Sequence, residues 1–213
     1  MFGVDFRLPL TNLKEYTHIV KALLREGSVD FQGKIYHAKA KVPRTFPDVE
    51  VMASALRLGS YEFCGEALDG AISWVSPYKF LAEEALPAMQ AGAKKSGRET
   101  PPLIAHVPMC VHDDSEEVKA AARQQLMHSP SLPFYVKMFE ASGYPEASTR
   151  VWSDEMIGAV VVSGNENQVA DRVKGIFDSG IGEIIVTYVT AGEDAKKSAD
   201  RTLDLLGNIA GKA

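Results

Sequence analysis

The chain has 213 residues and a formal net charge of −5, with 46% hydrophobic and 24% charged residues. This composition is typical of a globular protein that is long enough for one sizeable core. Its mild acidity, without clustered Lys or Arg, argues against nucleic acid or an anionic membrane surface as the main partner. No apolar run approaches the roughly 20 residues of a membrane helix, which argues against a transmembrane segment.

The N-terminal residues carry Asp5 and Arg7 inside an otherwise apolar run, which argues against a signal or transit peptide. The two cysteines, Cys64 and Cys110, fall in a predicted helix and a predicted strand. Two cysteines in a chain of this length do not form a disulfide scaffold. We therefore expect buried free thiols and a reducing, cytoplasmic location.

The first predicted element is a helix that begins at Thr11 or Asn12, which are both good N-caps, and ends at Gly27. Its apolar residues recur with helical spacing; they are Leu13, Tyr16, Ile19, Val20, Leu23 and Leu24. Residues 29–38 form two short alternating runs on either side of Gln32 and Gly33. This pattern predicts a small surface hairpin.

Residues 48–77 predict a βαβ unit, with strands at 49–53 and 71–75 and a helix at 56–68 between them. The first strand runs directly into the start of the helix. Backbone N–H groups at a helix start lack intrahelical partners and favour an anion, typically a phosphate. The unit therefore predicts an anion site at the end of its first strand.

Strands and helices continue to alternate toward the C-terminus. Further strands are predicted at residues 103–111 and 183–188, and helices at 78–96, 115–127, 133–142, 153–161 and 194–209, with another between Asn165 and Gly180. Asp113 and Asp114 are interpreted as caps. Residues 129–157 interrupt the alternation and are interpreted as an insertion before the last strand. The strands are apolar on both faces, as in parallel sheets covered by helices.

Four such strands predict an α/β fold of the (β/α) TIM-barrel type. A closed eight-stranded barrel takes about 250 residues, so this chain is expected to form about half a barrel. A half-barrel has two open strand edges and a bare inner face, which invite pairing with another chain. We therefore expect either a longer natural N-terminus or two copies that cover each other as a homodimer.

The order of the segments resembles the luciferase-like monooxygenase family, in its branch of deazaflavin- (coenzyme F-420-) dependent oxidoreductases. The resemblance covers nearly the whole chain, but only the second half of the family's fold. The stretches that carry it are NLKEYTHIVKALL with VDFQGKIYH, VEVMASALRLGSYEFCGEALDGAISWVSP, HVPMCVHDDSEEVKAAAR and VVVSGNENQVADRVKGIFDSGIGEIIVTYV. It implies that residues 1–213 are a single domain that carries barrel strands five to eight, with the N-terminal half missing.

The resemblance also implies a cofactor at the C-terminal ends of the strands, either deazaflavin coenzyme F-420 or, as the alternative, FMN. In the family the cofactor tail lies near the loop after strand five, with the loop after strand six beside it. The cofactor-binding residues implied in this chain are Ala53, Ser54, Ala55, Leu56, Arg57, Trp74 and Ser76. Many relatives have glycines in the first loop, where this chain has bulkier residues that limit close backbone approach.

The residue types themselves leave several roles open. Ser54 and Arg57 can bind an anion, or they can be a helix cap and a solvated cation. Trp74 can line the cofactor cavity or fill the barrel mouth. His106 can be a general base, but we interpret it as a core histidine. Residues 163–167, SGNEN, resemble a phosphate loop and are interpreted as a helix cap.

We therefore expect an oxidoreductase of the luciferase-like class that acts on paired donors, including a small-molecule substrate, with incorporation or reduction of oxygen. No catalytic residue is predicted. Metal-binding motifs such as HExxH and CxxC do not occur, so no metal site is expected. Two alternatives stay open: a non-catalytic flavin-binding or assembly protein of the same fold, and a phosphate-handling barrel lyase or isomerase.

Overall fold

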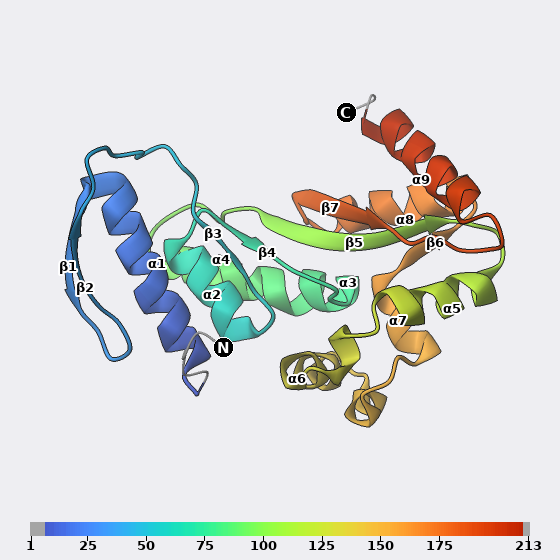
Figure 1. Ribbon diagram of the computed structural model, residues 1–213, viewed down its shortest axis with the longest axis horizontal. Helices are drawn as coiled ribbons and strands as arrows, with labels where there is room; N and C mark the ends of the chain where they lie inside the picture. Colours follow the sequence, from blue (N-terminus) through green and yellow to red (C-terminus); the bar gives the residue numbers. More distant parts are fainter. Residues whose placement is uncertain (1–6, 211–213) are drawn as a thin grey trace.

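The computed structural model describes residues 7–210, which contain one parallel sheet flanked by helices (Figure 1). The strands of this sheet are β3 (Met52–Ser54), β4 (Gly70–Ile72), β5 (Leu103–Val111), β6 (Val162–Gly164) and β7 (Glu183–Tyr188). They follow the order β3-β4-β5-β6, and β7 also pairs with β5. The predicted α/β class is confirmed, and the described strands form an open sheet that does not close into a barrel.

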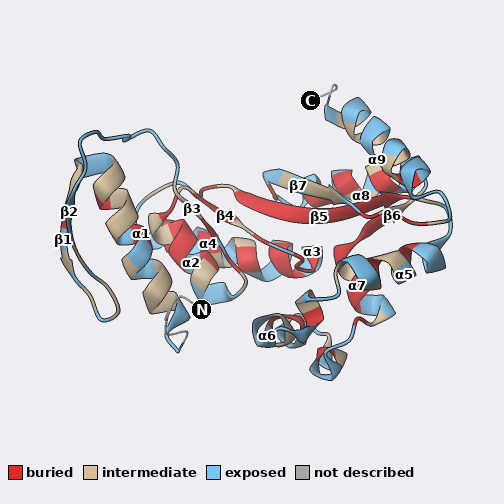
Figure 2. Cartoon of the chain, viewed as in Figure 1, coloured by how far each residue is buried: buried red, intermediate tan, exposed pale blue. Residues whose placement is uncertain are grey.

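The central strand is β5, which pairs with β7 along one edge, at residues 104–109. Along its other edge, β5 pairs with β4 at its start and with β6 at its end. The backbone N–H groups of His106 and His112 point to the shared edge, donating to the carbonyls of Ser73 and Gly164 at 3.3 and 3.0 Å. All residues of β5 are buried (Figure 2), which fits a sequence whose only polar side chain is His106.

The helices agree closely with the predicted ones. They are α1 (Pro9–Glu26), α2 (Leu58–Ala67), α3 (Tyr78–Phe80), α4 (Leu86–Lys95), α5 (Ser115–Gln125), α6 (Pro133–Ala141), α7 (Asp154–Val160), α8 (Glu166–Asp178) and α9 (Ala195–Ala210), with a π turn (Leu81–Ala85) and short 3₁₀ turns (Ser129–Ser131 and Pro145–Thr149). The predicted hairpin is confirmed as antiparallel β1 (Ser28–Gln32) and β2 (His37–Lys41). Among helices within residues 7–210, none combines the length and apolarity needed to cross a bilayer.

Several details differ from the sequence-based expectation. The strands predicted at 49–53 and 71–75 are shorter and shifted, at Met52–Ser54 and Gly70–Ile72. Strand β6 was not predicted, because its apolar residues continue from the end of α7 and only three residues pair with β5. Of the two acidic residues before α5, only Asp114 caps the helix, accepting hydrogen bonds from the N–H groups of Glu116 and Glu117. Asp113 instead pairs with Arg201 of α9 at 3.0 Å, so it joins two elements that are far apart in sequence.

The two faces of the sheet are covered unequally. On one face Ala71, Ala105 and Val107 are buried in the main core, together with side chains of α2 and α4. On the other face Trp74 is 43% exposed and Ile185 is 38% exposed. Within the described chain β3 and β7 each have one strand neighbour, so both outer edges are open. These features are those expected of half a barrel.

Helices α2 and α4 lie side by side against the sheet (Figure 1) and approach through two glycines. A β-carbon on Gly65 would lie 1.9 Å from the carbonyl oxygen of Met89. On the facing helix, a β-carbon on Gly92 would lie 1.9 Å from the carbonyl oxygen of Glu62. The two glycines therefore allow the backbones to pack directly against each other.

The expected buried thiols are confirmed. Cys64 of α2 and Cys110 of β5 are both free and fully buried. Burial raises the pKa of the Cys64 thiol to about 12 and that of the Cys110 thiol to about 11. Both side chains therefore stay protonated in the folded protein at neutral pH.

The β1–β2 hairpin is fastened to α1 by the carboxylate of Glu15. This carboxylate accepts hydrogen bonds from the backbone N–H groups of Lys34, Ile35 and Tyr36 at 2.7, 2.8 and 2.9 Å. These bonds, that of Tyr36 most strongly, hold the pKa of Glu15 below its ordinary value of 4.5. The carboxylate must be ionised to make them, so the attachment depends on pH.

We expect this attachment to be complete above pH 4.5 and to be lost as the pH falls through the lower pKa of the folded state. Amide hydrogen exchange at residues 34–36, corrected for the intrinsic pH dependence, should lose protection over that range. In Glu15→Gln, which keeps only one acceptor oxygen and no charge, the protection should be lower than in the wild type above pH 4.5 and should not change with pH. Equal protection in the two proteins, or protection in the wild type that does not change with pH, would contradict this assignment.

Candidate functional site

A groove of about 700 Å³ lies at the C-terminal ends of β3 and β4. The pairing of these strands brings the two following loops together, and the N–H of Ala55 donates to the carbonyl of Ile72 at 2.9 Å. The lining comes from four places. Two follow strands: Ser54–Arg57 with Gly59 and Ser60 at the end of β3, and Trp74 after β4. The other two are helix starts: Pro9, Leu10 and Leu13 of α1, and Leu132–Tyr135 at the start of α6.

Five of the seven predicted cofactor-binding residues line this groove, namely Ser54, Ala55, Leu56, Arg57 and Trp74. The other two do not. Ala53 is buried on the core side of the sheet, and Ser76 is fully buried within the loop that follows β4. The walls from α1 and α6 were not predicted, because their approach depends on contacts between elements that are distant in sequence.

Three helix N-termini meet at the groove, since its lining includes the first turns of α1, α2 and α6. None of the three has a side-chain cap or an acidic residue in its first turn. By contrast, α5, α7 and α8 are capped by Asp114, Ser153 and Asn165. A helix start carries partial positive charge and free N–H groups, so the convergence of three uncapped starts favours an anionic ligand.

Among the described residues that line the groove, Arg57 is the one with a charged side chain. It occupies the N-cap position of α2 with an extended backbone, and it is exposed. Among residues 7–210 it has no ion-pair partner, so its guanidinium is available to a ligand. Ser54 is also exposed and offers a hydroxyl on the same side of the groove. The two residues add polar donors to the three helix starts.

The Trp74 indole lies flat on the imidazole of His106, with ring centroids 3.7 Å apart and planes 5° from parallel. The His106 side chain is buried, as expected for a core histidine. Its Nδ1 accepts a hydrogen bond from the N–H of Val75 at 3.3 Å. The proton is therefore assigned to Nε2, which donates to Thr187 Oγ1 at 2.8 Å. Burial lowers the pKa of His106 to about 4, so the ring is neutral at pH 7.

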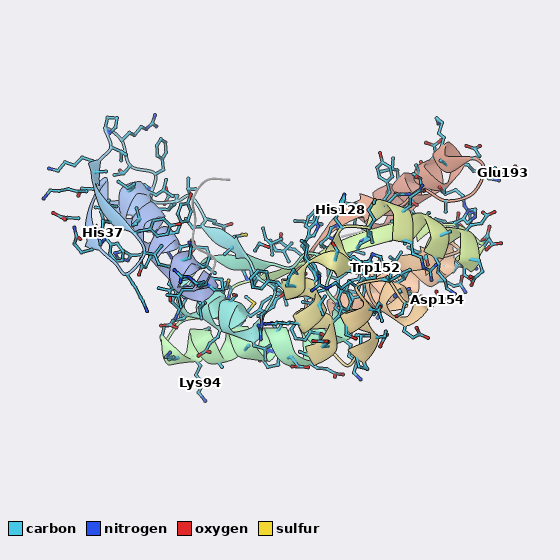
Figure 3. The ribbon with its side chains drawn as sticks, turned by 60° about the horizontal axis from the view of Figure 1, so that its bottom comes forward. His37, Lys94, His128, Trp152, Asp154 and Glu193 are labelled. Carbon is cyan, nitrogen blue, oxygen red and sulfur yellow. The ribbon has the colours of Figure 1, made fainter. Side chains whose placement is uncertain are left out.

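A hydrogen bond joins the insertion, residues 129–157, to the loop that follows β4. The hydroxyl of Tyr135 on α6 donates to the carbonyl of Trp74 at 3.1 Å. Trp152, marked in Figure 3, donates its indole N–H to the carbonyl of Leu126 at 2.9 Å and packs edge-on against Phe139. The insertion thus has a small aromatic core of its own and presents the start of α6 to the groove.

Removing this hydroxyl in Tyr135→Phe should loosen the insertion from the groove. Because the Trp74 carbonyl loses a partner, we expect a cost of about 1 kcal/mol and faster amide exchange in α6. Tyr144→Phe is the control, since the Tyr144 hydroxyl has no hydrogen-bond partner among the described residues and its ring packs on Phe139. Equal exchange rates of α6 in the two variants would show that the bond is not an anchor.

Two other predictions concern residues away from the groove. Residues 163–167 are confirmed as a helix cap, because Asn165 and Gln168 form a reciprocal capping box with bonds of 3.1 and 2.9 Å. Within residues 7–210 no three His, Cys, Asp or Glu side chains gather in a way that would hold a metal ion.

Comparisons with known proteins relate this geometry to a family. A family model described as luciferase-like monooxygenase matches residues 1–183. The 5,10-methylenetetrahydromethanopterin reductase of Methanolobus tindarius is 24% identical, over 96% of this chain and 67% of its own. Such a relative is about one and a half times as long as this chain.

Solved structures show the same fold at low identity. An F420-dependent secondary alcohol dehydrogenase in complex with an F420-acetone adduct has a TM-score of 0.73 and 16% identity, covering 96% of this chain and 64% of that one. The oxygenating constituent of 3,6-diketocamphane monooxygenase from Pseudomonas putida, in complex with FMN, has a TM-score of 0.53 and 14% identity, covering 91% and 60%. This chain therefore spans about two thirds of the length of the proteins that it matches.

Proposed function

Because the chain belongs to the luciferase-like monooxygenase family, we propose that it acts as a flavin- or deazaflavin-dependent oxidoreductase and that its groove holds the phosphate-bearing tail of the cofactor. The reaction proposed acts on paired donors, one of them a small-molecule substrate, with incorporation or reduction of oxygen. The observation that carries this proposal is the meeting of three uncapped helix starts beside Arg57, which has no ion-pair partner within residues 7–210.

The residues present fit a phosphate ester. Backbone N–H groups in the first turn of α2, the Ser54 hydroxyl and the Arg57 guanidinium are donors, and phosphate oxygens are acceptors. The remaining walls are mostly apolar, with Leu10, Leu13 and Phe134 among them. They would exclude water around the less polar part of the tail. When bound, the flavin or deazaflavin supplies the hydride chemistry, and the protein binds and orients it.

The cofactor proposed first is deazaflavin coenzyme F-420, with FMN as the alternative. The F420-dependent secondary alcohol dehydrogenase among the matched structures supports the deazaflavin, and the monooxygenase in complex with FMN supports the flavin. Both cofactors carry a phosphate beyond the ribityl chain, so the same donors would serve either one. The groove itself therefore supports the phosphate more directly than it supports a choice of ring.

Titration of the purified chain with F-420 and, separately, with FMN tests the proposal through the fluorescence of each ligand. We expect saturable binding of at least one of them. Binding with cofactor-dependent turnover supports the oxidoreductase, whereas binding without turnover supports a non-catalytic flavin-binding or assembly protein. Absence of binding to both ligands would contradict the assignment of the groove.

We also propose a homodimer as the working unit, since both outer strands of the sheet have open edges and Ile185 is exposed on the uncovered face. Light scattering coupled to gel filtration should then give twice the mass of the chain at micromolar concentration. A mass that stays that of one chain up to high concentration would contradict the dimer.

A further inference from the structure

Strand β4 leads into a turn whose backbone conformation is unfavourable for its residue. Val75 has φ of 49°, in the left-handed region, although its side chain is branched at the β-carbon and fully buried. A non-glycine residue in this region is strained and persists only where its surroundings fix it. Such positions cluster at functional sites, and this one directly follows Trp74 in the lining of the groove.

The surroundings that fix this turn come from β5 and β7. Nδ1 of His106 accepts the N–H of Val75, and Nε2 of the same ring is bonded to Thr187. In the parallel register, His106 on β5 lies opposite Ile185 on β7, so the side chains of His106 and Thr187 emerge on the same face of the sheet. One imidazole therefore bridges the turn after β4 to the last strand.

The same imidazole is the surface on which the Trp74 indole rests. One face of the indole is covered by His106 at 3.7 Å, while the side chain as a whole is 43% exposed. A general base would need a nitrogen free to reach substrate, but both nitrogens of His106 are engaged and the ring is buried beneath Trp74. These contacts suit a residue that acts through its neighbours.

We propose that His106 is a positioning residue, which holds the Val75 turn and the Trp74 indole as a flat platform for a planar ring of the ligand in the groove. This inference rests on the proposed function, since the ring is that of the flavin or deazaflavin. Indole faces stack on planar aromatic rings in offset or parallel geometry. A platform that is already oriented avoids the cost of ordering the side chain when the ligand binds.

The experiment isolates Trp74 optically and changes the two bonds of His106 separately. The chain has two tryptophans, so Trp152→Phe leaves Trp74 as the one indole emitter. In that background His106→Leu removes both hydrogen bonds. His106→Asn places an acceptor near the Nδ1 position and keeps the bond to Val75, whereas His106→Gln places its amide near Nε2 and keeps only the contact with Thr187. Near-ultraviolet circular dichroism and indole anisotropy are recorded without ligand, and then FMN is titrated.

We expect His106→Leu to lose most of the near-ultraviolet signal of Trp74, to lower its anisotropy and to weaken FMN binding roughly tenfold, the scale of one stacking contact. His106→Asn should restore both indole signals and most of the affinity, and His106→Gln should not. The inference would be overturned if the indole signals of His106→Leu equalled those of the protein that keeps His106. If that variant does not fold, equal signals in the Asn and Gln variants would overturn it.

The ligand-free signals separate this inference from the proposed function. A protein that binds neither FMN nor F-420, but whose Trp74 signals depend on His106 in the expected order, would contradict the proposed function and still show that His106 positions the Trp74 indole. A protein that binds FMN equally well with and without the imidazole, and with unchanged indole signals, would support the proposed function and overturn the positioning role.

Discussion

Replacing Gly65 with alanine is expected to lower the free energy of unfolding by about 3 kcal/mol or more. The added β-carbon would lie 1.9 Å from the carbonyl oxygen of Met89 and 2.7 Å from its carbonyl carbon. These are backbone atoms of α4, so relief requires the two helices to move apart and exposes the core between them. Gly92→Ala should have a similar effect, since its β-carbon would lie 1.9 Å from the Glu62 carbonyl oxygen.

Urea denaturation followed by far-ultraviolet circular dichroism measures this effect. Gly175→Ala is the matched control, because Gly175 is an exposed glycine inside α8 whose β-carbon would have no neighbour within 4 Å. That control should gain about 0.5–1 kcal/mol from helix propensity. Midpoints for Gly65→Ala and Gly92→Ala that match the unmutated protein would show that α2 and α4 do not pack through their backbones.

Replacing Arg57 with alanine is expected to weaken FMN binding by roughly ten- to a hundredfold, the scale of a lost charge-assisted hydrogen bond to phosphate. The binding of riboflavin, which lacks the phosphate, should change little, because its contacts do not include the guanidinium. Arg57→Lys should recover part of the loss, since it keeps the charge but not the forked geometry. Titration of both ligands against each variant gives the comparison.

Arg44→Ala is the control for the change in net charge. Arg44 lies over the ring of Phe46 and does not line the groove, so its loss should leave FMN affinity unchanged within twofold. An equal loss of affinity for FMN and riboflavin in Arg57→Ala would mean that Arg57 supports the loop and does not bind the phosphate. Equal losses of FMN affinity in the Arg44 and Arg57 variants would show that the effect comes from the change in net charge alone.

Much of the fold could be predicted because its signals are local. The strand 103–111 and the helix 133–142 differ from the observed elements by at most one residue at either end, since apolar runs, caps and prolines mark their limits. Strand β6 could not be predicted, because it is defined by its pairing with β5 and not by its residue pattern. The predicted start of α1 at Thr11 or Asn12 is two or three residues later than the observed start at Pro9, because these two residues are better N-caps than Leu8.

The candidate site was predictable only in part for the same reason. The residues of one loop, Ser54–Arg57, follow from a strand that runs into a helix, and Trp74 follows from the neighbouring strand. The walls supplied by α1 and α6 arise from contacts that no short pattern encodes. The left-handed Val75 runs against the preference of its residue type, so its conformation is set by tertiary contacts such as the bond to His106.

Because both thiols are buried, their reaction with an alkylating reagent reports local opening of the native protein. Cys64 lies on the helix that begins at the groove, and Cys110 lies in the central strand. Alkylation needs an exposed thiolate, so the folded protein should be inert to iodoacetamide and each site should react only when its segment opens. Comparing the modification rates of the two residues by mass spectrometry would therefore show whether the rim of the sheet opens before its centre.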